Sequence, residues 1–442
     1  MVRAVVDGVM APATGKVAVL MPGMGAVATT FMAGVEAMRL GLVEPVGSVA
    51  QQGRIARDED GTEEVAVRDV LEIPALDQLV FGGWDIYEGT AYDAALEANV
   101  LSAAHLEAVR PRLEKIRPMK AAFDQEYVRN LSGPNVKEET SKRALANSLR
   151  EDIREFMARH ECDRAVAVWC GSTEKFVVPS EVHLTLDAFE RGLDDDHPSI
   201  SPSMLYAYAC LKEGVPYANG APNLTVDCPA LVELADREGV AIAGKDFKTG
   251  QTLVKTILAP GFASRYLGVH GWYSTNILGN RDGAVLDAPE NFKTKEESKL
   301  SVLESILDRE AHPELYEEMT HKVRIDYYPP RGDNKEGWDN IDIFGWMGYP
   351  MQIKVNFLCR DSILAAPLVL DLTLFLDAAR RAGSVGVQEW LSFYFKAPQE
   401  VDGVTPDHDL FVQRRELDRE IRRLSELPVA LREGATVAAQ IG

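Results

Sequence analysis

The sequence predicts an α/β fold that is built from two parts. Short apolar runs typical of strands alternate with alanine- and leucine-rich helix patterns through the first half of the chain, as in layered α/β proteins. At 442 residues the chain is too long for one ordinary core, so two domains, or one domain with a large insertion, are expected. After residue 249 the alanine-rich helices become fewer, and the alternating run at 351–357 predicts a second sheet.

The clearest elements open the chain. Residues 17–20 form an apolar run that predicts a strand, 22–25 predict a turn, and 27–40 carry a long apolar helix pattern. Further strands are predicted at 79–81, 165–169 and 240–243, and further helices at 93–113 and 142–159.

Polar segments interrupt or follow these elements. The acidic run 57–64 and the aspartate- and proline-containing run 194–203 predict exposed loops. Residues 413–423 carry a charged helix pattern, which we expect to be solvated or to face another subunit. The apolar run 363–376 contains Pro367 and Asp371, so it is too short and too polar to span a bilayer and predicts a buried helix.

The composition excludes several classes of protein. Hydrophobic residues make up 46% and charged residues 26% of the chain, which are globular values. The net charge is 47 − 68 = −21, so neither nucleic acid nor an anionic membrane is an expected partner. The five scattered cysteines form no C-x-x-C pair, and the N-terminus lacks the pattern of a signal peptide. These features predict a cytoplasmic protein with reduced thiols.

A glycine pattern follows the first predicted strand. Gly23, Gly25 and Ala28 fit G-x-G-x-x-G/A at the start of the first helix. The first glycine permits a tight turn, the second lets the backbone approach a pyrophosphate, and the helix N-terminus stabilises the negative charge. A glycine turn without a ligand would show the same pattern, so this motif alone is weak.

The acidic residue that usually binds the ribose is not found at the usual spacing of about 20 residues. Glu44 stands near that distance, but it precedes Pro45 in a turn. Asp85 follows a predicted strand and a glycine pair, which makes it the better ribose candidate. Its alternative role is that of a helix-capping or turn aspartate.

Lysines and aspartates gather in the second half of an otherwise acidic chain. Residues 249–252 follow a strand and open a helix, so their amides predict an anion site, although simple capping by Thr249 explains the same pattern. Lys295 and Lys299 stand four residues apart, which is also the spacing of an ordinary solvated face. Asp361 lies between apolar runs, where a carboxylate is costly unless it is paired. Lys396 is flanked by aromatic residues, which can depress a lysine pKa.

The order of these segments resembles one family. The chain carries, in sequence, GKDFKTGQT, NILGNRDG, FKTKEESK, GDNK, RDSILAAPLVLDL and FKAP, preceded by FGGWDI, VWCGSTEK and YANGAP. This series resembles the myo-inositol-1-phosphate synthase (inositol-3-phosphate synthase) family from about residue 16 to 398, and it is closer to the compact prokaryotic members.

The resemblance implies a Rossmann-type NAD-binding domain that is built from both chain ends (1–249 and 364–442). It also implies an inserted mixed α/β domain for catalysis and oligomerisation (250–363) in a homotetramer. The implied reaction converts D-glucose 6-phosphate to 1D-myo-inositol 3-phosphate, as in inositol and phospholipid biosynthesis. Oxidation at C5 acidifies C6, an intramolecular aldol step closes the ring, and NAD returns the hydride. Preorganised ammonium groups suit this chemistry, because each step makes an oxyanion or moves a proton.

The resemblance carries roles onto individual residues. The implied catalytic residues are Lys295, Lys299, Lys335, Lys396, Asp282 and Asp361. Lys295 and Lys396 would move protons at the C5 oxygen and C6, Lys335 would polarise the C1 aldehyde, and Asp361 would orient a lysine. The phosphate is expected at Thr249, Gly250, Gln251 and Lys299. NAD is expected at Gly23, Met24, Gly25, Ala26, Val27, Asp85, Ser172, Thr173, Asp246, Asn276 and Asp282, the last on the nicotinamide side.

One loop and two single positions depart from the family pattern. The phosphate loop of many members is rich in glycine and asparagine, whereas here it reads Gly-Met-Gly-Ala-Val-Ala. Ser172 stands where many members have asparagine, and Leu224 replaces an expected amide residue. Pyrophosphate contacts must therefore depend more on the backbone.

Two alternatives belong to other classes. A Rossmann-type sugar-phosphate dehydrogenase would release NADH in each turnover, but it needs one acid–base residue and not four lysines. A catalytically inactive relative that only binds NAD is disfavoured because all four lysines are present. Metal use stays open, since some relatives need a divalent cation, others work with a monovalent ion, and no histidine–carboxylate cluster is visible.

Overall fold

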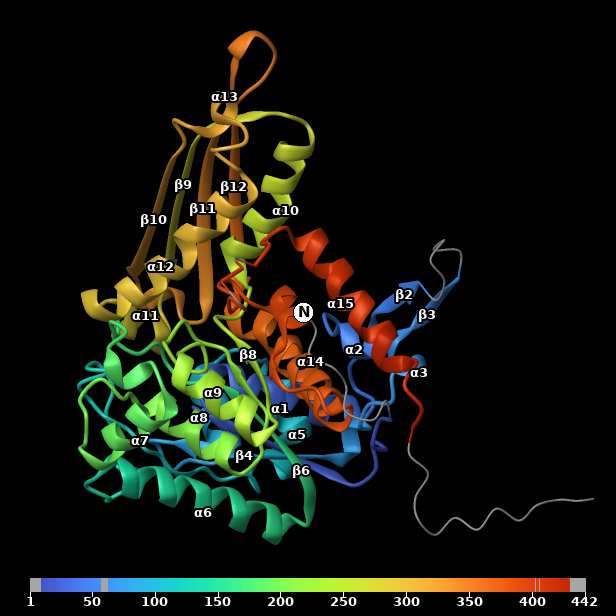
Figure 1. Ribbon diagram of the computed structural model, residues 1–442, viewed down its shortest axis with the longest axis vertical. Helices are drawn as coiled ribbons and strands as arrows, with labels where there is room; N and C mark the ends of the chain where they lie inside the picture. The colour runs from blue at the N-terminus through green and yellow to red at the C-terminus, as the bar shows by residue number, and fades with distance from the viewer. Residues whose placement is uncertain (1–8, 57–62, 402, 405, 430–442) are drawn as a thin grey trace, which may run out of the picture.

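The computed structural model describes residues 9–56, 63–401, 403–404 and 406–429, without the side chains of 292 and 295–301. The chain folds into a seven-stranded sheet between two layers of helices, and a four-stranded sheet projects from this body (Figure 1). The fold is thus mixed α/β, as the sequence predicts. The boundaries assigned to the two domains stay a prediction.

All seven strands of the larger sheet run parallel, in the order β5-β4-β1-β6-β7-β8-β13. Their bounds are β1 Lys16–Pro22, β4 Leu79–Asp85, β5 Met119–Lys120, β6 Cys162–Trp169, β7 Tyr217–Asn219, β8 Ala241–Gly244 and β13 Gly386–Val387. In chain order the first six strands have the 3-2-1-4-5-6 arrangement of dinucleotide-binding folds. Strand β13 comes from the C-terminal part of the chain, so both ends of the sequence contribute to this sheet.

Helices bury both faces of the seven-stranded sheet, as parallel sheets require. Val17 and Val19 of β1 pack toward one face, while Ala18 and Leu20 belong to the apolar cluster of the other. The first face is covered by α1 (Ala26–Arg39), α5 (Ala103–Leu113) and α14 (Asp361–Arg381), and the second by α6 (Lys142–His160), α8 (Pro202–Lys212) and α9 (Pro229–Glu238).

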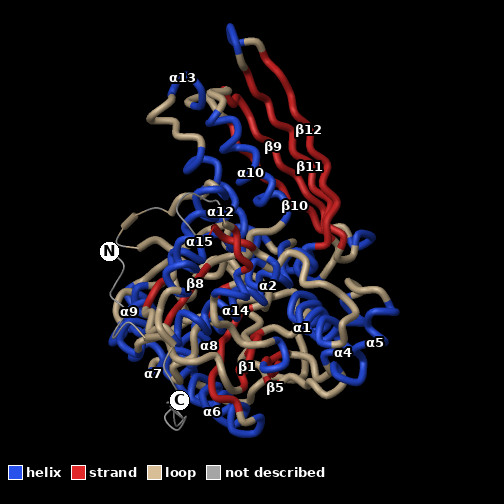
Figure 2. Tube along the Cα trace, turned by 90° about the vertical axis from the view of Figure 1, so that its right-hand side faces the viewer, coloured by secondary structure: helices blue, strands red, loops and turns tan. Residues whose placement is uncertain are grey.

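The smaller sheet has the order β10-β9-β11-β12, with a parallel β9–β10 pair and antiparallel neighbours otherwise. Its strands are β9 Gly268–Leu278, β10 Thr320–Tyr327, β11 Asn334–Phe344 and β12 Pro350–Arg360, and its helices are α10 (Gly250–Ser264) and α12 (Pro289–Ile306). These helices lie on one side of the strands (Figure 2), where Trp272 and Ile341 are buried against them. Tyr273, on the opposite side of β9, is 44% exposed.

The remaining helices and strands of the described residues connect these parts or pack on them. They are α2 Val49–Gln52, α3 Val67–Val70, α4 Ala91–Ala98, α7 Leu186–Asp194, α11 Arg281–Leu286, α13 Pro313–Tyr316, α15 Leu410–Ser425, β2 Arg54–Ala56 and β3 Glu64–Ala66, with five 3₁₀ turns at Leu76–Gln78, Glu181–His183, Pro329–Arg331, Trp346–Gly348 and Glu389–Tyr394. Strands β2 and β3 pair with each other. The charged helix expected at 413–423 is confirmed as part of α15, but it is not simply solvated: Leu417, Ile421 and Leu424 pack into the core of the same chain.

Two predicted elements differ from the structure. The single helix expected at 93–113 is two helices, because Asn99 adopts a left-handed conformation (φ 52°) and Ser102 caps the next helix. The loop expected at 194–203 is exposed only in its first half: Ser201 is buried and caps α8. Of the acidic run 57–64, residues 57–62 lie outside the described part of the chain.

Helix α14 confirms the buried helix expected at 363–376. By length and composition it could cross a membrane, but 72% of its apolar window is buried in the fold. It packs beside α1 against one face of the sheet, where Leu372, Leu374 and Phe375 are fully buried. A core helix of a globular protein has these properties.

Candidate active site

The glycine pattern forms the turn between β1 and α1. Gly23 has φ +84°, and a Cβ there would lie 2.3 Å from the Cα of Gly171, so only glycine fits. A Cβ at Gly25 would meet nothing within 4 Å. This cradle fits the pyrophosphate of a dinucleotide, because the backbone can come close and the N-terminus of α1 supplies partial positive charge.

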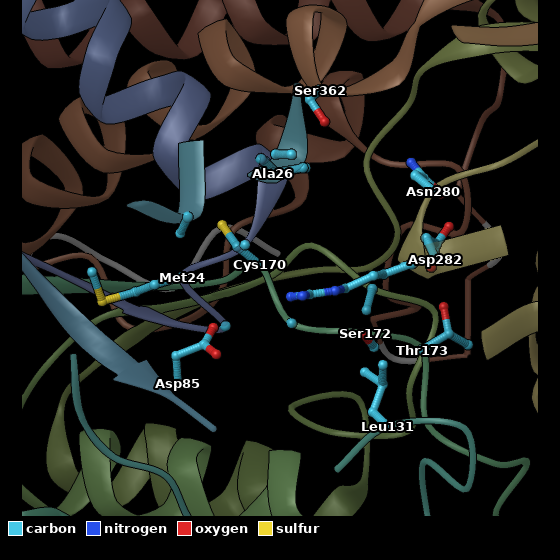
Figure 3. A pocket seen from close by; sticks show the side chains of 18 of the residues that line it. Met24, Ala26, Asp85, Leu131, Cys170, Ser172, Thr173, Asn280, Asp282 and Ser362 are labelled. Carbon is cyan, nitrogen blue, oxygen red and sulfur yellow. The ribbon is translucent and has the colours of Figure 1, made fainter. Parts of the chain in front are cut away.

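A cavity of about 910 Å³ opens at this turn and continues to the base of the smaller sheet. It lies at the carboxyl ends of the parallel strands, the usual ligand position in such sheets. In Figure 3, Met24 and Asp85 lie toward one end of the cavity, while Asn280 and Asp282 lie toward the other.

Asp85 ends β4, the strand that pairs with β1. Its carboxylate accepts a hydrogen bond from the backbone amide of Tyr87 at 3.1 Å, and burial raises its pKa above the ordinary value. This is the position from which an acid can bind the adenosine ribose. The usual spacing fails because α2, β2, β3 and α3 are inserted between α1 and β4.

The loop after β6 forms another wall. Cys170, Ser172 and Thr173 line the cavity (Figure 3). Burial alone raises the pKa of the Cys170 thiol well above its ordinary value, which disfavours the thiolate form that a nucleophile needs. Glu174 follows in the same loop. Its carboxylate accepts hydrogen bonds from the backbone amide and from the hydroxyl of Ser203.

Lys396 and Asp246 form a buried ion pair at the cavity wall. The Lys396 ammonium donates to Asp246 Oδ1 at 3.2 Å, and the two residues are 2% and 1% exposed. The loops that carry them are held together by their backbones: the amide of Lys396 donates to the carbonyl of Asp246 at 2.7 Å, and Phe247 pairs with Phe395. The Lys396 ammonium is therefore held in a fixed position next to the glycine turn.

A second pair, Lys335 and Asp361, lies at the N-terminus of α10. Lys335 Nζ donates to Asp361 Oδ2 at 2.7 Å, and a Cβ on Gly250 would lie 3.5 Å from Asp361 Oδ1 and 3.9 Å from Lys335 Nζ. Burial alone would lower the pKa of Lys335, but the Asp361 carboxylate outweighs burial and raises it. Asp282 adds to this effect and lines the same cavity.

The anion site expected at the start of α10 is only partly available. Thr249 lines the cavity and precedes α10 without capping it through its side chain. The Gln251 side chain is already used: its amide donates to the carbonyls of Thr275 and Trp338 and to Asp339 Oδ2 at 3.1 Å. A phosphate here would be bound by backbone amides of the first turn, not by the Gln251 side chain.

For two groups of predicted site residues, no contact among the described residues places the side chains at the cavity. Asn276 lies inside β9, where it is fully buried and donates to Gln251 Oε1 at 2.8 Å, away from the cavity lining. The side chains of Lys295 and Lys299 lie outside the described part of the chain, although both residues belong to α12. The roles assigned to all these residues stay predictions.

Several polar residues of the cavity were not predicted as site residues. Asp333 accepts from Asn280 at 2.9 Å and from Ser362 at 3.1 Å, and burial raises its pKa. Glu174 and Arg281 also line the cavity. Their positions in the sequence could have indicated them as site residues, because each follows a predicted strand or stands in a polar glycine loop. Among the described residues, no group of three or more histidine, cysteine, aspartate or glutamate side chains could hold a metal ion.

Comparisons with known proteins agree on one family. A family model described as myo-inositol-1-phosphate synthase matches residues 17–422. The inositol-3-phosphate synthase 1 of Bacteroides thetaiotaomicron is 52% identical over 415 residues, which cover 93% of this chain and 96% of the relative. The inositol-3-phosphate synthase 1 of Oryza sativa is 32% identical over 437 residues, which cover 92% and 85%.

Solved structures give the same result. The crystal structure of inositol-3-phosphate synthase from Caenorhabditis elegans has a TM-score of 0.87 at 26% identity and covers 97% of this chain and 89% of its own. A related protein from Thermotoga maritima, with a TM-score of 0.72 at 21% identity, supports the fold alone. The chain belongs to the myo-inositol-1-phosphate synthase family.

Proposed function

We propose that this chain converts D-glucose 6-phosphate to 1D-myo-inositol 3-phosphate and restores its NAD+ within each turnover. The observation that carries this proposal is the convergence of two lysine–aspartate pairs on one cavity. Lys396 and Asp246 line the cavity beside the glycine turn, and Lys335 is bonded to Asp361, which also lines it. Membership in the family supports the same reaction.

The cofactor fits the wall opposite α10. The residues that would hold it are the glycine turn at Gly23–Gly25, Asp85 at the ribose, and Ser172 with Thr173 further along the cavity. Bound there, NAD+ would supply the hydride acceptor for oxidation at C5 of the sugar and, in its reduced form, the hydride donor for the later reduction of the same carbon.

The chain's own groups must handle protons and oxyanions. After oxidation at C5, a proton leaves C6, and the resulting enolate attacks the C1 aldehyde, whose oxygen then takes a proton. Lys396, held by Asp246, would exchange a proton at the C5 oxygen, and Lys295 of α12 would share this traffic at C6. Lys335 keeps its proton because its pKa is raised, so it would polarise the C1 aldehyde as a fixed cation and not act as a base.

The substrate phosphate would lie at the first turn of α10. The amides that follow Thr249 and Gly250 point out of the helix end, and partial positive charge gathers there. Lys299 would add a full charge from α12. Because the Gln251 side chain is bonded within the fold, it would act by holding this turn in place.

The proposal is tested by incubating the purified chain with glucose 6-phosphate and NAD+, followed by phosphatase treatment and chromatographic detection of myo-inositol. We expect myo-inositol without accumulation of reduced nicotinamide, and a Lys396→Met control should form none. Steady accumulation of NADH without myo-inositol would instead establish the sugar-phosphate dehydrogenase and overturn the proposal. Dialysis against a chelator, with and without added divalent or monovalent salts, would settle the cation requirement.

We also propose a homotetramer. The face of the smaller sheet opposite α10 and α12 carries exposed apolar side chains such as Tyr273 (44%) and Leu358 (59%), which suits contact with another copy. Sedimentation velocity should give a tetramer, and Tyr273→Lys should shift it to smaller species. Leu96→Lys, on exposed α4, is the matched control and should leave the tetramer intact.

We propose that the chain works in the cytoplasm. The five cysteines are all free in the structure, which suits a reducing compartment. Fractionation of cells that produce the chain should recover it with soluble cytoplasmic markers. Recovery in a secreted or membrane fraction would contradict the proposal.

A further inference from the structure

The first turn of α12 is fastened to the cofactor half of the molecule by one buried amide. Asn291 is 1% exposed. Its Nδ2 group donates to the carbonyl of Tyr127 at 3.0 Å and to the carbonyl of Thr173 at 2.8 Å. One amide group thus joins carbonyls of two separate loops; the Tyr127 carbonyl also accepts from the amide of Lys175, so Thr173 depends more on Asn291 for its donor.

The next contacts continue along the same strip. The hydroxyl of Thr294, three residues after Asn291, donates to the carbonyl of Glu174 at 3.1 Å. The carbonyl of Glu290 accepts from the amide of Phe176 at 3.1 Å. Residues three apart share a helix face, so α12 lies along the loop 173–176 with a defined register.

The segment just before α12 is held in the same way. The side-chain amide of Asn130 donates to the carbonyl of Ala284 at 2.7 Å, and Val285 packs against Tyr127 and Val128 in a separate apolar cluster. The polar and apolar contacts therefore fix both α11 and the start of α12 on the loops 127–131 and 173–176.

This docking has a consequence for the active site, because Thr173 lines the cofactor cavity and Lys295 directly follows Thr294. In a helix, a slip by one residue turns every side chain by about 100° and moves it by about 1.5 Å along the axis. The contacts of Asn291 and Thr294 therefore fix the rotation of α12 about its axis relative to the loop that lines the cavity.

We propose that Asn291 is a positioning residue that sets the register of α12 against the cofactor loop, with Thr294 as its second support. The inference rests on the proposed function for its catalytic consequence. It does not rest on that function for the docking itself, which follows from the side-chain hydrogen bonds of Asn291 and Thr294.

Two variants and two controls test the proposal. Asn291→Asp keeps the size of the side chain but sets an oxygen against two carbonyls, and Thr294→Val removes the hydroxyl at constant shape. Thr294→Ser keeps the hydroxyl. Arg129→Gln removes an exposed ion pair to Glu290 across the same boundary, whose side chains are 61% and 50% exposed.

We expect amide hydrogen exchange along α12 to become at least tenfold faster in Asn291→Asp and several-fold faster in Thr294→Val, with no change in the two controls. The kcat for glucose 6-phosphate should fall by at least tenfold and by about threefold, respectively, while the Kd for NAD+ stays within threefold of the parent. The unfolding midpoint of Thr294→Val should stay close to that of Thr294→Ser.

Two results would overturn the proposal. One is unchanged exchange along α12 in Thr294→Val, which stays informative even where Asn291→Asp does not fold. The other is a loss of kcat that comes with an equal loss of NAD+ binding, since this would indicate general damage and not a lost register. If the parent chain forms no inositol phosphate, the proposed function fails, but the exchange experiment still decides whether Asn291 docks α12.

Discussion

The two sheets of this protein bury charged groups in different settings. In the body around the parallel sheet, buried Glu174 accepts from Ser203, and buried Asp371 accepts from Tyr394 and from backbone amides. Asp377 of the same body is paired with Arg164 and Arg381. Around the smaller sheet, Lys335 and Lys255 are buried. The parallel-sheet body thus buries acids beside neutral donors or arginines, whereas the smaller sheet also buries lysine ammonium groups.

This difference separates cofactor binding from charge stabilisation. The glycine turn would hold an anion with backbone amides and a helix end, which need no side chain and do not titrate. The lysines can stabilise an oxyanion or move a proton. Substitutions in the two regions should therefore differ in their effects on activity, cofactor affinity and stability.

Loss of the Lys335 ammonium should have the largest effect. Lys335→Ala leaves the Asp361 carboxylate without its 2.7 Å partner in a mostly buried position. We expect kcat to fall by about 10³-fold or more and the free energy of unfolding to fall by about 3 kcal/mol. Turnover of glucose 6-phosphate and urea unfolding measure the two quantities.

The double variant Lys335→Met with Asp361→Asn is the control. It removes both charges, so stability should recover while activity should not. Activity within tenfold of the parent in Lys335→Ala would show that this charge is not part of the chemistry.

The two glycines of the cofactor turn should respond differently to alanine. Gly23→Ala adds a Cβ 2.3 Å from the backbone of Gly171 at a positive φ, so the fold itself should be damaged. Gly25→Ala adds a Cβ in open space, so the unfolding midpoint should stay nearly constant while the Kd for NAD+ rises by about tenfold. Calorimetry and NAD+ titration separate the two effects, and unchanged NAD+ affinity in Gly25→Ala would place the pyrophosphate elsewhere.

Lys255 should make stability rise with pH. Burial lowers its pKa to about 8 from an ordinary value of 10.5, so between these values the unfolded chain binds more protons than the folded one. Its contribution is present above 10.5 and is lost as the pH falls through 8. In Lys255→Met, the unfolding free energy should be flatter in this window, as measured by urea unfolding at a series of pH values.

Glu174 should give the opposite sign in the other region. Burial raises its pKa to about 7 from 4.5, so the folded chain binds more protons between these values. Its contribution is present below 4.5 and is lost as the pH rises through 7. Glu174→Gln should remove this decline, and equal pH slopes in parent and variant would contradict the assignment.

The smallest effect is expected at the outer surface of the parallel-sheet region. Arg110 and Glu114 form an i,i+4 ion pair on α5, and their side chains are 48% and 45% exposed. Arg110→Ala should leave the unfolding midpoint and kcat unchanged within the error of the measurements, because exposed ion pairs contribute little to stability. A clear loss of stability in urea unfolding would contradict this expectation.

Much of the parallel sheet could be predicted because its signals are local. The strand at 17–20, the glycine turn and the following helix each carry their own pattern within a few residues. The break at Asn99 also had a local signal, since asparagine tolerates left-handed backbone and Ser102 is a good cap. The long helix pattern on both sides concealed it.

The contacts of the site could not be predicted in the same way, because they join distant segments. Lys396 meets Asp246 across 150 positions, and Lys335 reaches Asp361 because the register of β11 and β12 places Lys335 opposite Cys359. Gln251 and Asn276 are amides of the type that binds ligands, but the fold uses both to bond each other. A sequence shows which groups are polar, whereas tertiary packing decides which of them keep a free hydrogen bond for a ligand.

The placement of α14 also matters while the protein is being made. A ribosome synthesises β1, the glycine turn and Asp85 long before α14 and Lys396, yet α14 buries one face of the sheet and Lys396 completes the cavity wall. The nascent chain therefore exposes the apolar residues of β1 and α1 until the last quarter of translation. The glycine turn is therefore made before Lys396, and an unfinished chain lacks part of the cavity wall and of the helical cover of the sheet.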